Sequence, residues 1–259
     1  MNETAKPRIP YRTPMFFWQT LLGVAFLGAW QELVNAGKLD KFFFSRPSDI
    51  AARIFEWFRT GSIWPHLLVT MEEAALAFAL GAASGMIFGF GLARAPRLGR
   101  LFDPYIKVLN ALPRVVLAPI FLLWFGLGIW SKVALGVTVV FFIVFFNTHQ
   151  GVRDVDPVVV NNARMLGASE WQLVRHVLIP SALTWVFSSL HISIGFAMIA
   201  VVVGEYLGAA RGVGYLISQA EGTFDTTGVF AGMAVLSAVV LIIGWGVDRL
   251  EHWLLRWKV

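Results

Sequence analysis

The fold is decided by the stretch Asn161-Asn162-Ala163-Arg164-Met165-Leu166-Gly167, which is followed after nine residues by Val177-Leu178-Ile179-Pro180 and then by residues 181–204. Residues 181–204 form an apolar run of 24 residues in which His191 is the only titratable side chain. A helix of about 20 apolar residues crosses the hydrocarbon core of a bilayer. The sequence here predicts a polar loop that faces water and leads into a membrane helix.

Further apolar runs lie on both sides of this segment. Residues 74–93 and 228–247 are runs of 20 residues each, and residues 13–31 form a run of 19, all without a charged side chain. Residues 115–147 hold two shorter runs, divided near Gly126. The predicted fold class is therefore an all-α membrane protein with six transmembrane helices.

The composition agrees with this class. Hydrophobic residues make up 57% of the chain and charged residues 14%, whereas soluble domains carry about 25% charged residues. The net charge is +5, and we interpret the basic residues as topology signals beside membrane spans rather than as a nucleic-acid site. The chain has no cysteine, so no disulfide or thiol chemistry is expected.

The distribution of Lys and Arg predicts the orientation. With the N-terminus in the cytoplasm, twelve Lys and Arg residues fall in inner segments and seven in outer segments, which favours cytoplasmic N- and C-termini. A cleaved signal peptide is an alternative, because Lys6, Arg8 and Arg12 precede the first span and Val34-Asn35-Ala36 resembles a cleavage site. The run of 19 residues exceeds the usual signal core of about 7–15 residues, which favours a membrane anchor.

We divide the chain into two parts. Residues 1–64 are predicted to form an N-terminal anchor helix and an amphipathic segment on the outer face. Residues 65–259 are predicted to form a five-helix core with a cytoplasmic coupling loop at 151–180. In the amphipathic segment, Pro47-Ser48-Asp49 predicts a helix start with Ser48 near the cap, and apolar side chains recur at helical spacing through residues 50–58.

Three glycines mark the second span. Gly81, Gly85 and Gly89 recur at intervals of four residues, which places them on one stripe of a helix. Small residues in this pattern allow a neighbouring helix to approach closely. We predict a packing seam here rather than a ligand site.

The third span is the best candidate for a wall of a transport pathway, because prolines break helices and broken membrane helices can line cavities. Arg114, at the inner edge of this span, either extends toward Asp103 or faces the pathway and attracts an anion. Glu72, Glu73 and Glu205 lie at span ends and are interpreted as interfacial carboxylates, with a lining role as the alternative. The candidate pathway residues are Asn110, Pro113, Arg114, Pro119, Asn147 and Glu205.

Several enzyme signatures are missing from the sequence. There is no phosphate-binding glycine loop, no His-Glu-x-x-His zinc helix and no Gly-x-Ser-x-Gly nucleophile turn. We predict no catalytic residue, no metal site and no cofactor for this chain. If transport here uses ATP, the ATPase must be another polypeptide.

Within the coupling loop, Asp156-Pro157 predicts the start of a short helix over residues 158–166, with Gly167 as the turn that follows. Residues 170–179 predict a second helix that runs past Pro180 into the fifth span. A short helix standing off the membrane suits docking into a groove of a partner. An ordinary connecting loop is the alternative.

This loop resembles the EAA loop of permease subunits in binding-protein-dependent ABC importers. Ala163, Gly167 and Pro180 fall on the motif at its spacing, whereas the motif's glutamate is Asn161 and its first alanine is Asn162. Further stretches resemble the nitrate/sulfonate/taurine branch. They are Leu101-Phe102-Asp103-Pro104, Leu112-Pro113, Ala118-Pro119, Trp124-Phe125-Gly126, Gly204-Glu205, Gly212-Val213-Gly214-Tyr215 and Phe224-Asp225-Thr226.

The resemblance implies a homodimeric type I importer permease in the bacterial inner membrane. The solute it implies is small and anionic, such as a sulfonate, taurine or nitrate. Each copy would dock one of two cytoplasmic ABC ATPase subunits, which bind ATP and magnesium, through a helix at about residues 158–167. A periplasmic or lipid-anchored binding protein would deliver the solute. The implied ATPase-coupling residues are Asn161, Asn162, Ala163, Arg164, Leu166, Gly167 and Ala168.

Two other functions are compatible with six spans. An ion-coupled secondary carrier could also have a broken third helix, but it gives no reason for the 151–180 loop. A membrane scaffold would bind a soluble partner without moving a solute.

Overall fold

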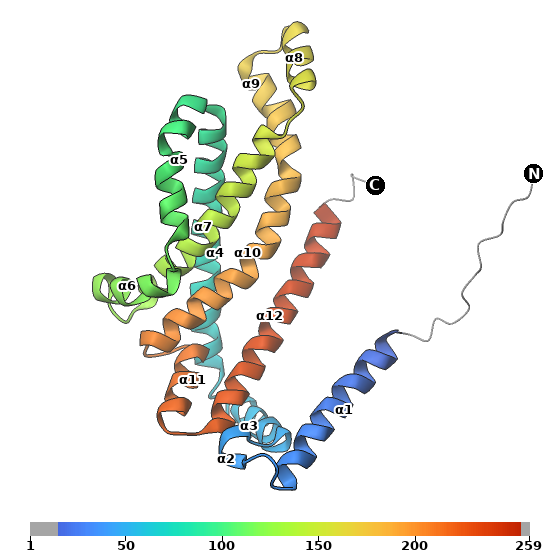
Figure 1. Cartoon of the computed structure of the whole chain (residues 1–259), viewed down its shortest axis with the longest axis vertical. Coiled ribbons are helices and arrows are strands. Elements are labelled where there is room, and N and C mark those ends of the chain that lie inside the picture. Colours follow the sequence, from blue (N-terminus) through green and yellow to red (C-terminus); the bar gives the residue numbers. More distant parts are fainter. Residues whose placement is uncertain (1–14, 255–259) are drawn as a thin grey trace, which may run out of the picture.

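A computed structural model describes residues 15–254, and these residues form helices joined by short loops, with no strand among them (Figure 1). The all-α class is therefore confirmed. The basic residues at both ends that entered the orientation prediction lie outside the described residues: Lys6, Arg8, Arg12, Arg256 and Lys258.

Three long helices form the centre of the bundle: α4 (Trp64–Arg94), α7 (Ile129–Arg153) and α10 (Ile179–Gly208). Their shared core consists of small and β-branched residues, such as Ala82, Val140 and Val144, which are all buried. Small side chains allow the helix backbones to approach closely, which is how membrane helices gain packing contacts when surrounding lipid is equally apolar.

The glycine stripe of α4 faces α7. A Cβ atom at Gly81 would lie 2.7 Å from the Cβ of Val140, at Gly85 2.8 Å from the Phe141 carbonyl oxygen, and at Gly89 2.6 Å from the Phe145 carbonyl oxygen. Such distances are too short for real side chains. The structure therefore places all three glycines at the closest approach of α4 and α7.

The third span is a bent pair rather than a single helix. α5 (Pro96–Ala111) meets the 3-10 turn η1 (Arg114–Leu117) and α6 (Ala118–Phe125) at an angle of 86°. Leu112 and Pro113 separate the two parts, and proline cannot donate the backbone hydrogen bond that would continue α5. The position of the third span therefore stays a prediction, because the pair is either one broken span or a re-entrant loop.

Four single helices are long and apolar enough to cross a membrane, and the bent pair brings the number to five among the described residues. The four are Trp64–Arg94, Ile129–Arg153, the continuous run Glu170–Gly208, and Thr226–Val247 within α12 (Thr226–Leu254). α1 (Met15–Asn35) has 21 residues, a length of about 31 Å at 1.5 Å per residue. It stands apart from the bundle in Figure 1, and its role as the sixth span stays a prediction.

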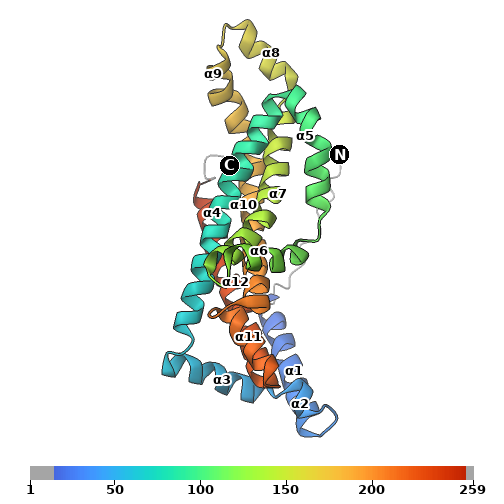
Figure 2. The same cartoon turned by 90° about the vertical axis from the view of Figure 1, so that its left-hand side faces the viewer.

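One end of the bundle, here named the α3 end, carries the short helices α2 (Lys41–Phe44), α3 (Pro47–Thr60) and α11 (Val213–Gly222). Figure 2 shows α3 lying across the long axis of the bundle, as expected for a helix that rests on a membrane surface. The predicted helix start is confirmed, since α3 begins at Pro47; Arg46 is the N-cap residue, and Ser48 lies in the first turn.

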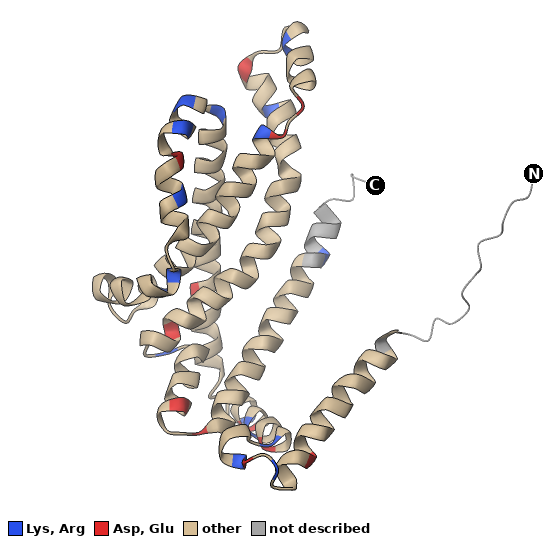
Figure 3. Cartoon of the chain, viewed as in Figure 1, with Lys and Arg blue, Asp and Glu red and all other residues tan. Residues whose placement is uncertain are grey.

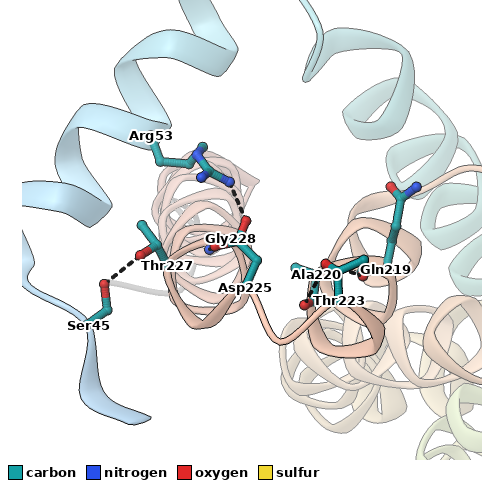
Figure 4. A network of polar contacts seen from close by, with 8 residues as sticks. All are labelled: Ser45, Arg53, Gln219, Ala220, Thr223, Asp225, Thr227 and Gly228. Atoms are coloured by element: carbon teal, nitrogen blue, oxygen red, sulfur yellow. Dashed lines mark hydrogen bonds and ion pairs between the residues drawn. The ribbon is translucent and has the colours of Figure 1, made fainter. Parts of the chain in front are cut away.

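A polar network fastens α3 to the start of α12 (Figure 4). Arg53 Nη1 lies 2.5 Å from Asp225 Oδ2, and the backbone N–H of Gly228 donates to Asp225 Oδ1 at 3.0 Å. Ser45 and Thr227 form a second hydrogen bond of 2.8 Å between their hydroxyl groups. These contacts join segments more than 170 residues apart in sequence.

The Arg53–Asp225 ion pair is predicted to stabilise the fold less at acidic pH. Partial burial alone would raise the pKa of Asp225, but the hydrogen bonds from Arg53 and Gly228 and the Arg53 charge together lower this pKa below its ordinary value of 3.8. A lowered pKa in the folded state contributes stability above the ordinary pKa, and this contribution is lost as the pH falls through the lowered value. We expect the stability difference between wild type and Asp225→Asn to stay constant from pH 7 to about pH 5 and to shrink at lower pH. Thermal unfolding followed by tryptophan fluorescence at each pH measures this difference, and a difference that grew on acidification would contradict it.

Candidate coupling surface and transport pathway

α8 (Pro157–Met165) stands at the opposite end of the bundle, here named the α8 end, beyond the ends of α4, α7 and α10 (Figure 1). Its start follows from local chemistry: the Asp156 side chain accepts a hydrogen bond of 2.8 Å from the Val158 backbone N–H, and Pro157 occupies the first turn. Gly167 ends the segment with φ +83°, a left-handed conformation that glycine adopts without steric cost.

The tip of this segment is apolar and open. Met165 is 85% exposed and Leu166 is 89% exposed. Of the seven residues predicted to contact an ATPase, Ala163 and Ala168 are half-buried and the other five are exposed. Exposed apolar side chains at the tip of a capped helix are typical of a surface that a partner covers.

An ion-pair bridge holds this segment against the bundle. The carboxylate of Glu170, at the start of α9 (Glu170–Leu173), accepts hydrogen bonds from Arg94 at 3.0 Å and from Arg164 at 3.1 Å. Arg94 ends α4 and Arg164 lies on α8, so one carboxylate joins three elements. Sequence analysis missed this bridge, because nothing local relates Arg94 to a residue 76 positions away.

Two local features of the same segment were also missed. Ser169 and Gln172 form a capping box at the start of α9, and the Ser-x-x-Gln spacing was a readable signal. Residues Val174–Leu178 then form a π-helix, named η2, before α10 begins. The predicted run past Pro180 into the fifth span is confirmed, but the sequence offered no signal for the wider turn.

Arg114 lies at the bend of the third span. Its Nη2 donates to Asn110 Oδ1 at 2.5 Å, and its guanidinium carbon lies 5.2 Å from the ring centre of Phe142. Arg114 also borders a cavity of about 200 Å³ whose other walls are Val115 of η1 and apolar residues of α7 and α10. The alternative in which Arg114 reaches Asp103 is wrong, since Asp103 pairs with Lys107 at 2.7 Å.

Arg114 retains an unused donor. Its buried Nε–H has no hydrogen-bond partner among the described residues, and a buried donor of this kind costs about 1–3 kcal/mol until it is satisfied. A cation with a spare donor at the edge of a cavity can bind an anionic group.

The structure brings together only some of the predicted pathway residues. Asn110, Pro113 and Arg114 meet at the bend, and Pro119 lies in the first turn of α6. Asn147 donates to the Ile143 carbonyl in its own helix at 2.8 Å.

Glu205 does not line a pathway in this structure, because it is only 1% exposed. Its carboxyl accepts from Thr70 Oγ1 at 2.6 Å and from the Gly214 backbone N–H at 2.7 Å. The Val213 backbone N–H donates to the same Thr70 oxygen at 2.9 Å. Glu205 therefore fastens α10 to α4 and to the first turn of α11 (Val213–Gly222).

Two neighbouring charges are buried as well. Glu73 is 2% exposed and Lys132 is 1% exposed. The Lys132 ammonium donates to the carbonyl oxygens of Leu127 at 2.6 Å and Gly128 at 3.0 Å, which holds the loop between α6 and α7. The interpretation of Glu73 and Glu205 as interfacial carboxylates is wrong, because both side chains are buried. Each side chain is enclosed by helices that come from distant parts of the sequence.

Comparison with known proteins identifies the family. The sequence profile described as "Binding-protein-dependent transport system inner membrane component" matches residues 81–257. The chain belongs to this family of permeases. The predicted resemblance to permeases of binding-protein-dependent ABC importers is confirmed. The protein is a multi-pass inner-membrane component of an ABC importer, and in such importers the ATPase is a separate subunit.

Two relatives and one solved structure place this permease more closely. It is 32% identical to the riboflavin transport system permease protein RibX of Chloroflexus aurantiacus, covering 88% of this chain and 85% of RibX. It is 26% identical to the taurine transport system permease protein TauC of Escherichia coli, covering 96% of this chain and 94% of TauC. An inward-facing structure of the MetNI methionine ABC transporter superposes with a TM-score of 0.61 at 18% identity, covering 73% of this permease and 96% of that chain. The type I importer permease fold is therefore confirmed.

Proposed function

We propose that two copies of this permease form the transport pathway of an ATP-driven importer for a small anionic solute of the sulfonate, taurine or nitrate type. Two cytoplasmic ATPase subunits, which bind ATP and magnesium, would dock on the α8 end. A periplasmic or lipid-anchored binding protein would deliver solute at the α3 end. Both termini would then lie in the cytoplasm, as the distribution of Lys and Arg favours.

The observation that carries this proposal is the exposed tip of α8. A short capped helix with Met165 and Leu166 open to solvent presents a small apolar knob on a rigid support. Such a knob fits a groove on a partner. The Glu170 carboxylate connects this support to the end of α4, because it pairs with both Arg164 of α8 and Arg94 of α4.

The first test of this surface is Leu166→Asp. We expect the variant to lose co-purifying ATPase by at least tenfold, because a carboxylate at the knob would be buried without a partner in the groove. Quantitative mass spectrometry of the complex purified from its own host membranes measures the ATPase ratio.

The matched control is Phe224→Asp, which makes the same type of change at a 75% exposed side chain at the α3 end. It should retain the ATPase. Equal retention by both variants would remove the α8 tip from the docking surface.

The anionic class rests on Arg114. We expect Arg114→Ala to raise the apparent KM for an anionic solute about tenfold, since a charge-assisted hydrogen bond contributes about 1.5–3 kcal/mol. Arg114→Lys keeps the charge and should fall between wild type and alanine. Uptake of radiolabelled taurine by cells that carry the matching binding protein provides the measurement. The control is Lys107→Ala, which removes an exposed basic side chain of α5 that does not line the Arg114 cavity. Unchanged kinetics in Arg114→Ala would exclude a role in solute binding.

The rival function, an ion-coupled secondary carrier, is separated by the energy source. Proteoliposomes that contain the purified complex should accumulate solute only when ATP, magnesium and the binding protein are present. Accumulation driven by a sodium or proton gradient without ATP would favour the carrier.

A further inference from the structure

A polar cavity of about 380 Å³ lies between α4, α5 and α7, near the α8 end of the bundle. It is distinct from the cavity beside Arg114, because no residue borders both. Leu92 and Ala93 of α4 form one wall, Pro96, Gly99, Arg100 and Asp103 of α5 form another, and His149 and Arg153 of α7 form the third. Nothing in the proposed transport cycle uses these residues.

The cavity carries more positive than negative charge. Neither Arg100 nor Arg153 has a carboxylate partner within 4.0 Å among the described residues. Arg100 makes only a long contact of 3.4 Å from Nε to the Pro96 carbonyl. The one acidic residue in the lining, Asp103, is paired with Lys107 at 2.7 Å. Figure 3 shows Lys and Arg gathered along α5 and at the nearby helix ends.

The helix α5, which forms one wall of this cavity, also carries exposed apolar side chains outside the cavity lining. α5 has no buried residue, and its side chains Leu101 and Tyr105 are exposed. A helix that crosses a membrane places such side chains against lipid. A phosphate group with several acceptor oxygens matches two guanidinium groups, and basic pockets between membrane helices near the bilayer surface suit lipid headgroups.

We propose that the cavity between α4, α5 and α7 binds a phosphate-type oxyanion through Arg100 and Arg153. The oxyanion is either the phosphodiester headgroup of an anionic membrane lipid or a free phosphate or sulfate ion. In both cases the bound group joins α5, which has little packing of its own, to the end of α7.

The absence of cysteine from the chain makes this site directly testable. In an Ala93→Cys variant, the new thiol lines the cavity, and bound ligand should slow its reaction with a water-soluble maleimide. The control is Leu98→Cys, because Leu98 is exposed on the same stretch but does not line the cavity. The full-length chain is used with the subunits that co-purify with it, and labelling of this chain is quantified by mass spectrometry.

The lipid arm compares nanodiscs of phosphatidylcholine with nanodiscs that contain phosphatidylglycerol. The soluble arm adds phosphate, sulfate or chloride at equal ionic strength to protein in lipid-free neutral detergent. Protection of Ala93→Cys by phosphatidylglycerol alone assigns a lipid, and protection by phosphate or sulfate beyond chloride assigns a soluble oxyanion. Either result supports the site.

Arginine variants then test the ligands. In the Ala93→Cys background, Arg100→Gln and Arg153→Gln should each weaken half-maximal protection about tenfold. Arg97→Gln, the same charge change on α5 outside the cavity lining, should leave it unchanged. Two results would overturn the proposal. One is that Arg97→Gln weakens protection as much as Arg100→Gln and Arg153→Gln do. The other is that neither phosphate or sulfate, compared with chloride, nor phosphatidylglycerol, compared with phosphatidylcholine, protects the Ala93→Cys thiol. The comparison of ligands needs no arginine variant, so it holds even if a glutamine variant fails to fold.

Discussion

Replacement of Gly89 by leucine is expected to leave no folded protein in the membrane. A Cβ atom at this position would lie 2.6 Å from the Phe145 carbonyl oxygen and 3.0 Å from the Thr148 Cβ. Neither atom can move aside cheaply, because one belongs to the backbone and the other lies at a buried position of α7. The two helices must separate to admit a leucine, which removes contacts along the whole seam.

The smaller change Gly89→Ala provides a graded measurement. Overpacking costs about 1–3 kcal/mol in a well-packed core, and the free energy of unfolding in mixed detergent micelles should fall by this amount. Gly91 is the matched control, since a Cβ atom there meets nothing within 4 Å. Gly91→Leu and Gly91→Ala should both accumulate as folded protein. Equal losses at Gly89 and Gly91 would show that helix propensity, rather than the α4–α7 seam, controls the result.

Replacement of Glu205 by alanine is expected to have the second large effect. The change removes the acceptor of two hydrogen bonds, from Thr70 and from the Gly214 backbone, in a site that water does not reach. Each buried partner left unsatisfied costs about 1–3 kcal/mol, so we expect a loss of about 2–6 kcal/mol for the two partners. Gly212 and Gly214 wrap tightly around this carboxyl, with Gly212 at φ +119°, and the loop should loosen when the carboxyl is absent.

Limited proteolysis near residues 209–212 measures the loosening, and the free energy of unfolding measures the loss of stability. Glu72→Ala is the control, because Glu72 is exposed one residue from the buried Glu73. Glu205→Gln keeps the shape and one acceptor oxygen, and should lose less than Glu205→Ala. A Glu205→Ala protein as stable as the Glu72→Ala protein would contradict the role assigned to this cluster.

The coupling segment could be predicted from sequence because its determinants are local. Asp156 and Pro157 start α8, and Gly167 ends the turn that follows it. The glycine stripe of α4 was readable for the same reason, since a four-residue interval places its members on one face. In each case, residues within one or two helical turns specify the geometry.

The two polar clusters could not be predicted in this way. Thr70 and Glu205 are separated by 135 positions and Arg94 and Glu170 by 76, so only the tertiary fold brings them together. α5 was not predicted as a helix, because Arg97, Arg100, Asp103 and Lys107 interrupt its apolar residues. Its apolar and charged side chains instead divide between two faces of one helix.

The continuous helical run from Glu170 to Gly208 has a mechanical consequence. Its 39 residues correspond to about 58 Å at 1.5 Å per residue. Glu170 joins one end of the run to α8 and α4, and Glu205 joins the other end to the first turn of α11. The run is thus a single long helical segment held by polar contacts at both ends. The π-helical turn at Val174–Leu178 interrupts its regular α-helical geometry near the Glu170 end. If a partner moved the 151–180 loop, this continuous run would carry the movement from the α8 end toward the α3 end of the bundle.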